Sequence, residues 1–94
     1  MNFWVYLLRC SNGSYYVGHT DDVARRLEEH SAGKGAEHTR KYWPVHVVYK
    51  EPFYSECDAI RRELQIKRWS RSKKAALAAG ELQTLKQLAK RRTA

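Results

Sequence analysis

The chain opens with two apolar, aromatic-rich runs of β-prone residues that a short polar segment separates. The first run extends from Asn2 to Arg9 and the second from Ser14 to His19. The segment between them contains Asn12-Gly13, and Asn-Gly between such runs is the strongest short-range signal for a β-hairpin. The pattern therefore predicts an antiparallel pair of strands at the start of the fold.

The turn of this hairpin decides where Tyr6 and Tyr16 point. A two-residue turn puts the two tyrosines on opposite faces, because side chains alternate along a strand. A three-residue turn, with Gly13 in the left-handed conformation, pairs Tyr6 with Gly18 and sets both phenols on one face. Turn statistics favour the first register. We favour the second, because a glycine under two phenols leaves room for a ligand to approach the backbone.

Capping residues and helical spacing predict four helices and one further strand. The capping cluster Thr20-Asp21-Asp22 precedes the first helix, and Ser55 with Asp58 resembles a capping box before the second. The predicted segments are a helix over Val23–Ser31, a basic loop over Lys34–Tyr42, a strand from Pro44 to about Pro52, and helices over Ser55–Trp69, Ser72–Ala79 and Glu81–Arg91. The order β-β-α-β-α-α-α predicts an α+β fold. We expect a single domain over residues 1–94, with a small three-stranded antiparallel sheet flanked by helices.

Charge is the compositional feature that bears most on function. The 94 residues carry a formal net charge of +8, which suggests a polyanionic partner, most often nucleic acid. DNA is the expected form more than RNA, and the expected contacts come from Lys34, Arg40, Lys41, Lys67 and Arg71. No apolar run is long enough for a membrane span, and Cys10 and Cys57 lack zinc-site spacing. We therefore expect a soluble, cytoplasmic protein, monomeric by default.

Glu63 is the most informative single position. Its helical neighbours Ile60 and Ile66 are apolar, and Leu64 extends the same stripe. A carboxylate inside an apolar stripe is costly to bury unless it is paired or holds a metal. Glu63 is thus either a metal ligand or catalytic acid, or one half of an ion pair with Lys67 at the rim of the core.

Arg26 and His30 lie four residues apart on the first predicted helix and point to one side. Arginine suits bidentate contact with a phosphate, and histidine can accept a proton or orient a water. The structural alternative is an Asp22–Arg26 surface ion pair and a half-buried histidine beside Leu27. Tyr6 and Tyr16 are by default aromatic residues of the sheet, and His19 is a structural residue at a strand end.

Two phenols, a guanidinium, an imidazole and a lone carboxylate in a strongly basic domain match metal-assisted phosphodiester cleavage. A divalent ion on Glu63 would neutralise charge on the phosphate, Arg26 would clamp it, and a tyrosine or His30 would help deprotonate water. A tyrosine needs help in that role, because its ordinary pKa is ~10.

The same residues resemble a known family. The triplets WVY and YVG look like the paired motifs of GIY-YIG nucleases, and the similarity continues through ARRLEEH, GKGAEHTRKYWPV and AIRRELQIKRWSRSKK. The chain most resembles the small, single-domain bacterial members of uncertain role. The resemblance implies a three-stranded sheet flanked by helices and Mg²⁺- or Mn²⁺-dependent cleavage of nucleic acid. It implies Tyr6 as the base, Tyr16 as the residue orienting water or phosphate, and Glu63 as the metal ligand, with Arg26 and His30 completing the site.

The chain departs from this family in one way that bears on activity. Many members carry an asparagine late in the catalytic region, where this chain reads Trp69-Ser70-Arg71-Ser72. Two functions therefore stay open: a nuclease acting on structured or single-stranded DNA ends in repair or recombination, and a non-catalytic DNA- or RNA-binding module with a degenerate site. A helix-turn-helix adaptor built from residues 72–90 is a third, weaker hypothesis.

Overall fold

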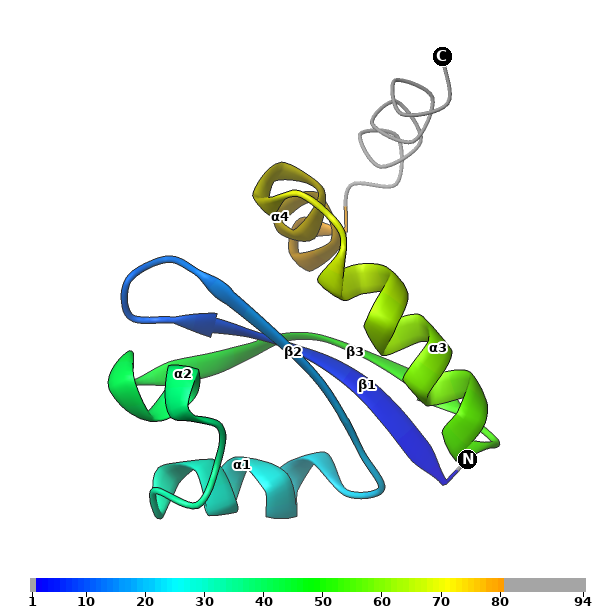
Figure 1. The fold of residues 1–94 in the computed structure, drawn as a ribbon, viewed down its shortest axis with the longest axis horizontal. Coiled ribbons are helices and arrows are strands. Elements are labelled where there is room, and N and C mark those ends of the chain that lie inside the picture. The colour runs from blue at the N-terminus through cyan, green and yellow to red at the C-terminus, as the bar shows by residue number, and fades with distance from the viewer. Residues whose placement is uncertain (1, 81–94) are drawn as a thin grey trace.

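The computed structural model describes residues 2–80, in which a three-stranded antiparallel sheet lies between two pairs of helices (Figure 1). The strands are β1 (Phe3–Cys10), β2 (Tyr15–Thr20) and β3 (Val45–Phe53), in the spatial order β2-β1-β3. The helices are α1 (Val23–Ser31), α2 (Glu37–Lys41), α3 (Glu56–Lys67) and α4 (Arg71–Ala79). The predicted fold class is confirmed, and the helix predicted over Glu81–Arg91 lies outside the described residues.

The segment predicted as a basic loop contains the short helix α2. Its charges suit a helix dipole, because Glu37 lies in the first turn and Arg40 and Lys41 lie in the last. Thr39 is fully buried and donates a hydrogen bond to the Ala36 carbonyl. Contact with the rest of the protein therefore adds one turn of helix that polar composition alone did not predict.

The hairpin between β1 and β2 has the three-residue turn. The Cys10 N–H donates to the Ser14 carbonyl at 2.8 Å, and the Gly13 N–H donates to the Cys10 carbonyl at 2.9 Å. Gly13 has a φ of 81°, which is the left-handed conformation that glycine adopts without strain. Tyr6 accordingly pairs with Gly18, as the favoured register predicted.

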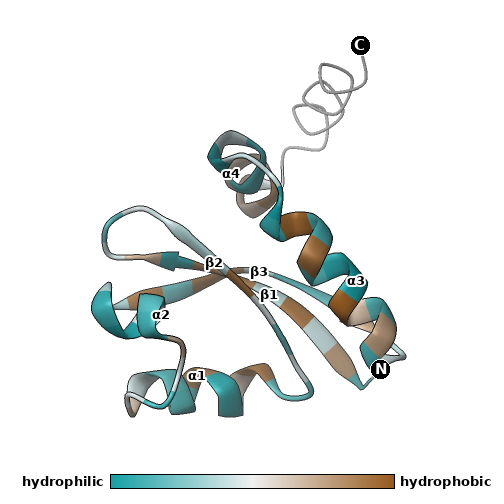
Figure 2. Cartoon of the chain, viewed as in Figure 1, coloured by the Kyte–Doolittle hydropathy of each residue, from teal (hydrophilic) through white to brown (hydrophobic). Residues whose placement is uncertain are grey.

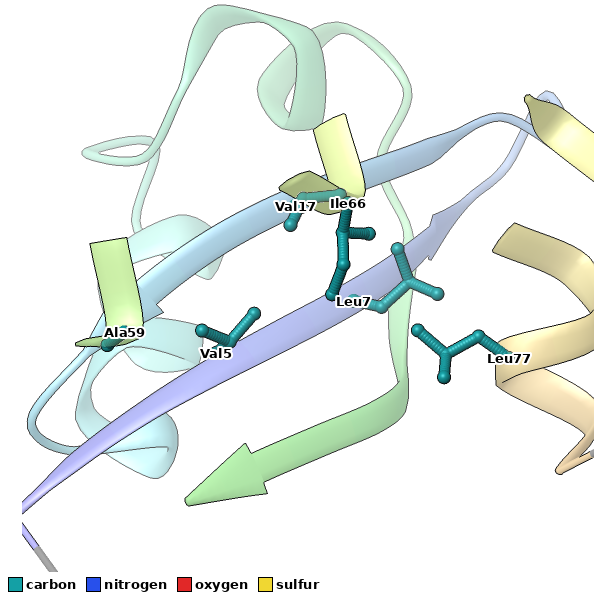
Figure 3. Close-up of a cluster of buried hydrophobic side chains, with 6 residues drawn as sticks. All are labelled: Val5, Leu7, Val17, Ala59, Ile66 and Leu77. Carbon is teal, nitrogen blue, oxygen red and sulfur yellow. The ribbon is translucent and has the colours of Figure 1, made fainter. Parts of the chain in front are cut away.

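The two faces of the sheet carry different cores. Val5, Leu7 and Val17 face α3 and α4, where they pack against Ala59, Ile66 and Leu77 (Figure 3). Tyr6, Leu8 and Cys10 point the other way and pack with Val45 and, in part, Leu27 of α1. Hydrophobic colour accordingly runs along β1, whereas α1 and α2 are largely hydrophilic (Figure 2).

The predicted apolar stripe of α3 needs one correction. Its buried residues are Ala59, Glu63 and Ile66, whereas the side of the helix with Leu64 is open and that residue is half exposed. Leu64 follows Glu63 directly, and successive helical residues point about 100° apart. Leu64 therefore does not extend the stripe, although Glu63 does lie within it. None of the helices within residues 2–80 has the length and apolar character that crossing a membrane requires.

Candidate active site

A chain of hydrogen bonds joins buried side chains from β1, α1 and α2. The Tyr6 hydroxyl lies 3.3 Å from His30 Nε2, and His30 Nδ1 lies 2.8 Å from Thr39 Oγ1. Thr39 donates its only hydroxyl proton to the Ala36 carbonyl, so it accepts from His30 Nδ1–H. In the neutral ring Nε2 is then unprotonated and accepts the Tyr6 proton. The network thus assigns His30 as a proton acceptor for Tyr6.

Burial and charge keep His30 neutral. Burial lowers the pKa of His30, and the positive charge of Arg26 lowers it further against a smaller opposing effect of Glu29. Burial also raises the pKa of Tyr6, while its interaction with the Arg26 guanidinium lowers it. Tyr6 is therefore a protonated phenol at neutral pH that has a neutral imidazole beside it.

Glycines at two positions make room for this pair. Gly18 lies opposite Tyr6 on β2, and a Cβ there would collide with the Tyr6 hydroxyl. A Cβ on Gly35 would collide with the ring of His30 in the same way. Neither glycine has a positive φ, so close approach of a side chain is the reason for both.

Tyr16 and Arg26 complete the group on this face. The Tyr16 ring centroid lies 6.4 Å from that of Tyr6 and 5.8 Å from that of His30. Arg26 lines the same pocket as Tyr6 and His30 and pairs with Glu29 at 3.1 Å. Asp22 is not its side-chain partner, because the Asp22 carboxylate accepts from the Arg25 N–H and caps α1. The alternative surface pair Asp22–Arg26 is therefore wrong.

Glu63 approaches from α3, on the opposite face of the sheet. One carboxylate oxygen lies 2.7 Å from His19 Nδ1 and the other lies 3.1 Å from Lys67 Nζ. The Glu63–Lys67 pair, the expected alternative to a metal ligand, is thus present, and His19, expected only as a structural strand-end residue, is a second partner. Burial is the main cause that raises the pKa of Tyr6, and the negative charge of Glu63 adds a smaller increase.

The donor set is compatible with magnesium or manganese. Within residues 2–80 there is no group of three or more His, Cys, Asp or Glu that could hold a metal. Mg²⁺ commonly keeps several waters and uses one or two carboxylates together with substrate phosphates. A carboxylate offers about four lone-pair sites, so the bonds from His19 and Lys67 leave acceptor capacity on Glu63. The residues present therefore fit an ion that also takes oxygens from a phosphate.

The five basic residues predicted to bind nucleic acid are all exposed but do not form one cluster: Lys34, Arg40, Lys41, Lys67 and Arg71. Lys34, Arg40 and Lys41 belong to the α2 region on one face of the sheet. Lys67 and Arg71 belong to α3 and α4 on the other. A Cβ on Gly13 would lie 2.9 Å from an Arg71 guanidinium nitrogen, which places Arg71 beside the hairpin turn.

Comparison with known proteins agrees with the family resemblance of the sequence motifs. The GIY-YIG catalytic domain family matches residues 2–76. A UPF0213 protein of Halobacterium salinarum is 51% identical over 73 residues, which are 78% of this chain and 95% of that protein. A UPF0213 protein of Staphylococcus aureus is 43% identical over 74 residues, which are 79% of this chain and 90% of that protein.

Solved structures resemble the same fold. The solution NMR structure of a UPF0213 protein from Bacillus halodurans is 43% identical, with a TM-score of 0.55 over 86% of each chain. An E. faecalis protein solved by NMR is 34% identical, with a TM-score of 0.58 over 87% of this chain and 88% of that one. The chain therefore belongs to the GIY-YIG family, a nuclease family, and resembles its small UPF0213 members.

Proposed function

We propose that this protein is a Mg²⁺- or Mn²⁺-dependent nuclease that hydrolyses phosphodiester bonds at structured or single-stranded DNA ends. We place it in the cytoplasm, as a monomer, in DNA repair or recombination. The observation that carries the proposal is the buried Tyr6–His30–Thr39 chain, in which a phenol faces a neutral imidazole of fixed tautomer.

In this proposal Tyr6 acts as the general base with His30 behind it. The attacking water gives its proton to the Tyr6 oxygen while the Tyr6 proton passes to His30 Nε2. The water oxygen then bonds to phosphorus and the bond from phosphorus to the leaving oxygen breaks. This relay avoids a free phenolate, which burial disfavours at Tyr6.

The other residues bind the phosphate and set its orientation. Arg26 would hold two phosphate oxygens and stabilise the charge that grows on them. Tyr16 would orient the water or the phosphate from the same face. A Mg²⁺ or Mn²⁺ ion on Glu63, when bound, supplies positive charge at the phosphate and the leaving oxygen.

A cleavage assay on a panel of labelled DNAs tests the proposal. The panel includes single strands, flaps, branched junctions and blunt duplexes, each with Mg²⁺ or Mn²⁺. Tyr6→Phe removes one hydroxyl and should lower the rate by about 10²–10⁴, the usual contribution of a general base. Tyr54→Phe is the matched control, because Tyr54 is 77% exposed and lies outside the site. Equal cleavage by wild type and Glu63→Ala would mean that the activity belongs to another protein or another site.

A second candidate function is binding without catalysis. The observation in its favour is that His19 and Lys67 each bond one oxygen of Glu63, so the carboxylate has a counter-ion without any metal. A protein of this kind would bind the same DNAs with unchanged affinity after Tyr6→Phe and would cleave none of them.

A further inference from the structure

Charge changes sign along the open edge of the sheet, next to the site just described. Strand β2 is an edge strand, and the hairpin turn at Gly13 and the start of α1 lie at its two ends. Helix α3 packs against β2 on one face of the sheet, and α4 contacts β3 but reaches the hairpin turn through Arg71. The helices α1 and α2 lie on the other face (Figure 1). Side chains of α3 and α4 therefore form one wall at the two ends of this edge, and side chains of α1 and α2 form the other.

On the wall made by α3 and α4, acidic side chains lie near the end of β2 and basic side chains lie toward the hairpin turn. Glu56 lies 3.9 Å from His19 near the end of β2, and Glu63 lies 2.7 Å from the same histidine. Lys67 comes one helical turn after Glu63, and Arg71 then lies beside Gly13. Helix α4 adds Lys74 and carries no acidic residue, whereas its Lys73 is buried over the Trp69 ring.

The wall made by α1 and α2 is also more basic at the turn end, where Arg40 and Lys41 of α2 outnumber Glu37. At the turn end, His38 of α2 bonds the Ser14 hydroxyl at 2.8 Å, and Lys41 lies one turn further along the helix. At the other end stand Asp21 and Asp22, at the start of α1.

The basic side chain beside those two acids is already held in ion pairs within the protein. Arg25 forms ion pairs with Asp21 and, at 3.4 Å, with Glu29. The end of β2 next to α1 is consequently a poor place for a phosphate, whereas the turn end suits one.

We propose that the protein grips its nucleic acid on only one side of the scissile phosphate. The strand runs along the edge of β2 from the catalytic group toward the hairpin turn. Its phosphates lie between Arg71 on one wall and Lys41 on the other. Beyond the catalytic group, in the direction of Asp21 and Glu56, the phosphates of the nucleic acid have no free basic side chain within residues 2–80 to contact. The inference rests on the proposed function and identifies the substrate as one cut close to an end or a junction.

Binding at several salt concentrations tests this polarity without any need for cleavage. The probe is a fluorescein-labelled single-stranded DNA, measured by fluorescence anisotropy without metal. Each phosphate contact on a single strand contributes about 0.7 to the slope of log affinity against log salt. Arg71→Gln should therefore reduce the slope by about 0.7. Arg61→Gln should leave it unchanged, because Arg61 lies beside Asp58 in the acidic first half of α3, away from the hairpin turn.

Reversing a charge at the acidic end should change the salt slope in the opposite direction. Glu56→Lys should increase the slope by about 0.7, because it offers a phosphate contact where the wild type has repulsion. Equal slopes for Arg71→Gln and Arg61→Gln, or weaker binding by Glu56→Lys, would overturn the proposal.

A second experiment locates the grip relative to the cut. Neutral methylphosphonates replace the phosphates of a cleaved DNA one at a time, and the wild-type cleavage rate is measured for each. Positions that slow cleavage should all lie on one side of the cut, and equal sensitivity on both sides would refute the one-sided grip. A protein that cleaves nothing but shows the expected salt slopes would contradict the nuclease proposal alone.

Discussion

The hydroxyl of Tyr6 lies directly over Gly18 of the neighbouring strand, where any side chain would collide with it. The two residues pair across β1 and β2 only because the hairpin has a three-residue turn. The length of the turn thus sets the position of a phenol four residues back along β1, about 13 Å away.

Gly18→Ala should reduce activity more than stability. The new Cβ displaces the Tyr6 hydroxyl from His30, while the backbone of Gly18 is one that alanine adopts without strain. We expect a cleavage rate close to that of Tyr6→Phe. Gly33→Ala is the counterpart, because Gly33 has a φ of 79° and nothing near it. It should cost about 1 kcal/mol in stability and leave the rate unchanged. Urea unfolding and cleavage assays on both variants separate the two effects, and an active Gly18→Ala would argue against Tyr6 as the base.

Thr39→Val should release His30 from its assigned tautomer. The variant keeps the shape of Thr39 but leaves His30 Nδ1–H without the hydroxyl that accepts from it. An unsatisfied buried donor costs about 1–3 kcal/mol, so the unfolding free energy should fall by that amount. The ¹⁵N chemical shifts of the His30 ring report the tautomer directly. Thr39→Ser keeps the hydroxyl and should preserve the wild-type spectrum. An unchanged ring spectrum in Thr39→Val would show that Thr39 does not set the tautomer.

Local patterns were sufficient to predict most of the scaffold and part of the site. Strand alternation and the i, i+4 spacing on α1 correctly put Tyr6, Tyr16, Arg26 and His30 on one face, once the turn length was chosen. That choice depended on an argument about ligand access, because turn statistics alone favoured the register that the structure does not have.

Contacts between distant segments were the part that local patterns could not predict. His19 and Glu63 are 44 positions apart, and His19 offered no signal beyond its place after Gly18. Thr39 and Gly35 position His30 from a segment whose polar composition predicted only a loop. A usable signal did exist there, since a glycine close in sequence to a candidate histidine can mark close packing.

The stability of the fold should depend on pH through His30. Its pKa in the folded protein lies below the ordinary value of ~6.5. As the pH falls from about 6.5 toward the folded pKa, the unfolded chain takes up a proton that the folded protein does not. The free energy of unfolding should therefore decrease over that window, by at most about 1.4 kcal/mol per pH unit. Above the window, the full contribution of neutral His30 to stability is retained. Urea unfolding of wild type and His30→Gln between pH 5 and 8 isolates this contribution. If the unfolding free energies of the two proteins changed with pH in parallel, His30 would not be the source of the pH dependence.

Lys67→Met should strengthen binding of a divalent ion at Glu63. Lys67 Nζ lies 3.1 Å from a Glu63 oxygen and would compete for it with the proposed metal ion. The stability cost of removing the pair should be small, about 0.3–0.5 kcal/mol, because Lys67 is half exposed. Mn²⁺ titration followed by electron paramagnetic resonance measures binding without DNA or turnover. We expect Lys67→Met to bind Mn²⁺ more tightly than wild type and Glu63→Gln to bind it least. Lys74→Met, on α4, controls for the loss of one positive charge. Weaker or equal binding by Lys67→Met would show that the lysine supports the carboxylate rather than competing for it, which is the behaviour expected of the non-catalytic candidate.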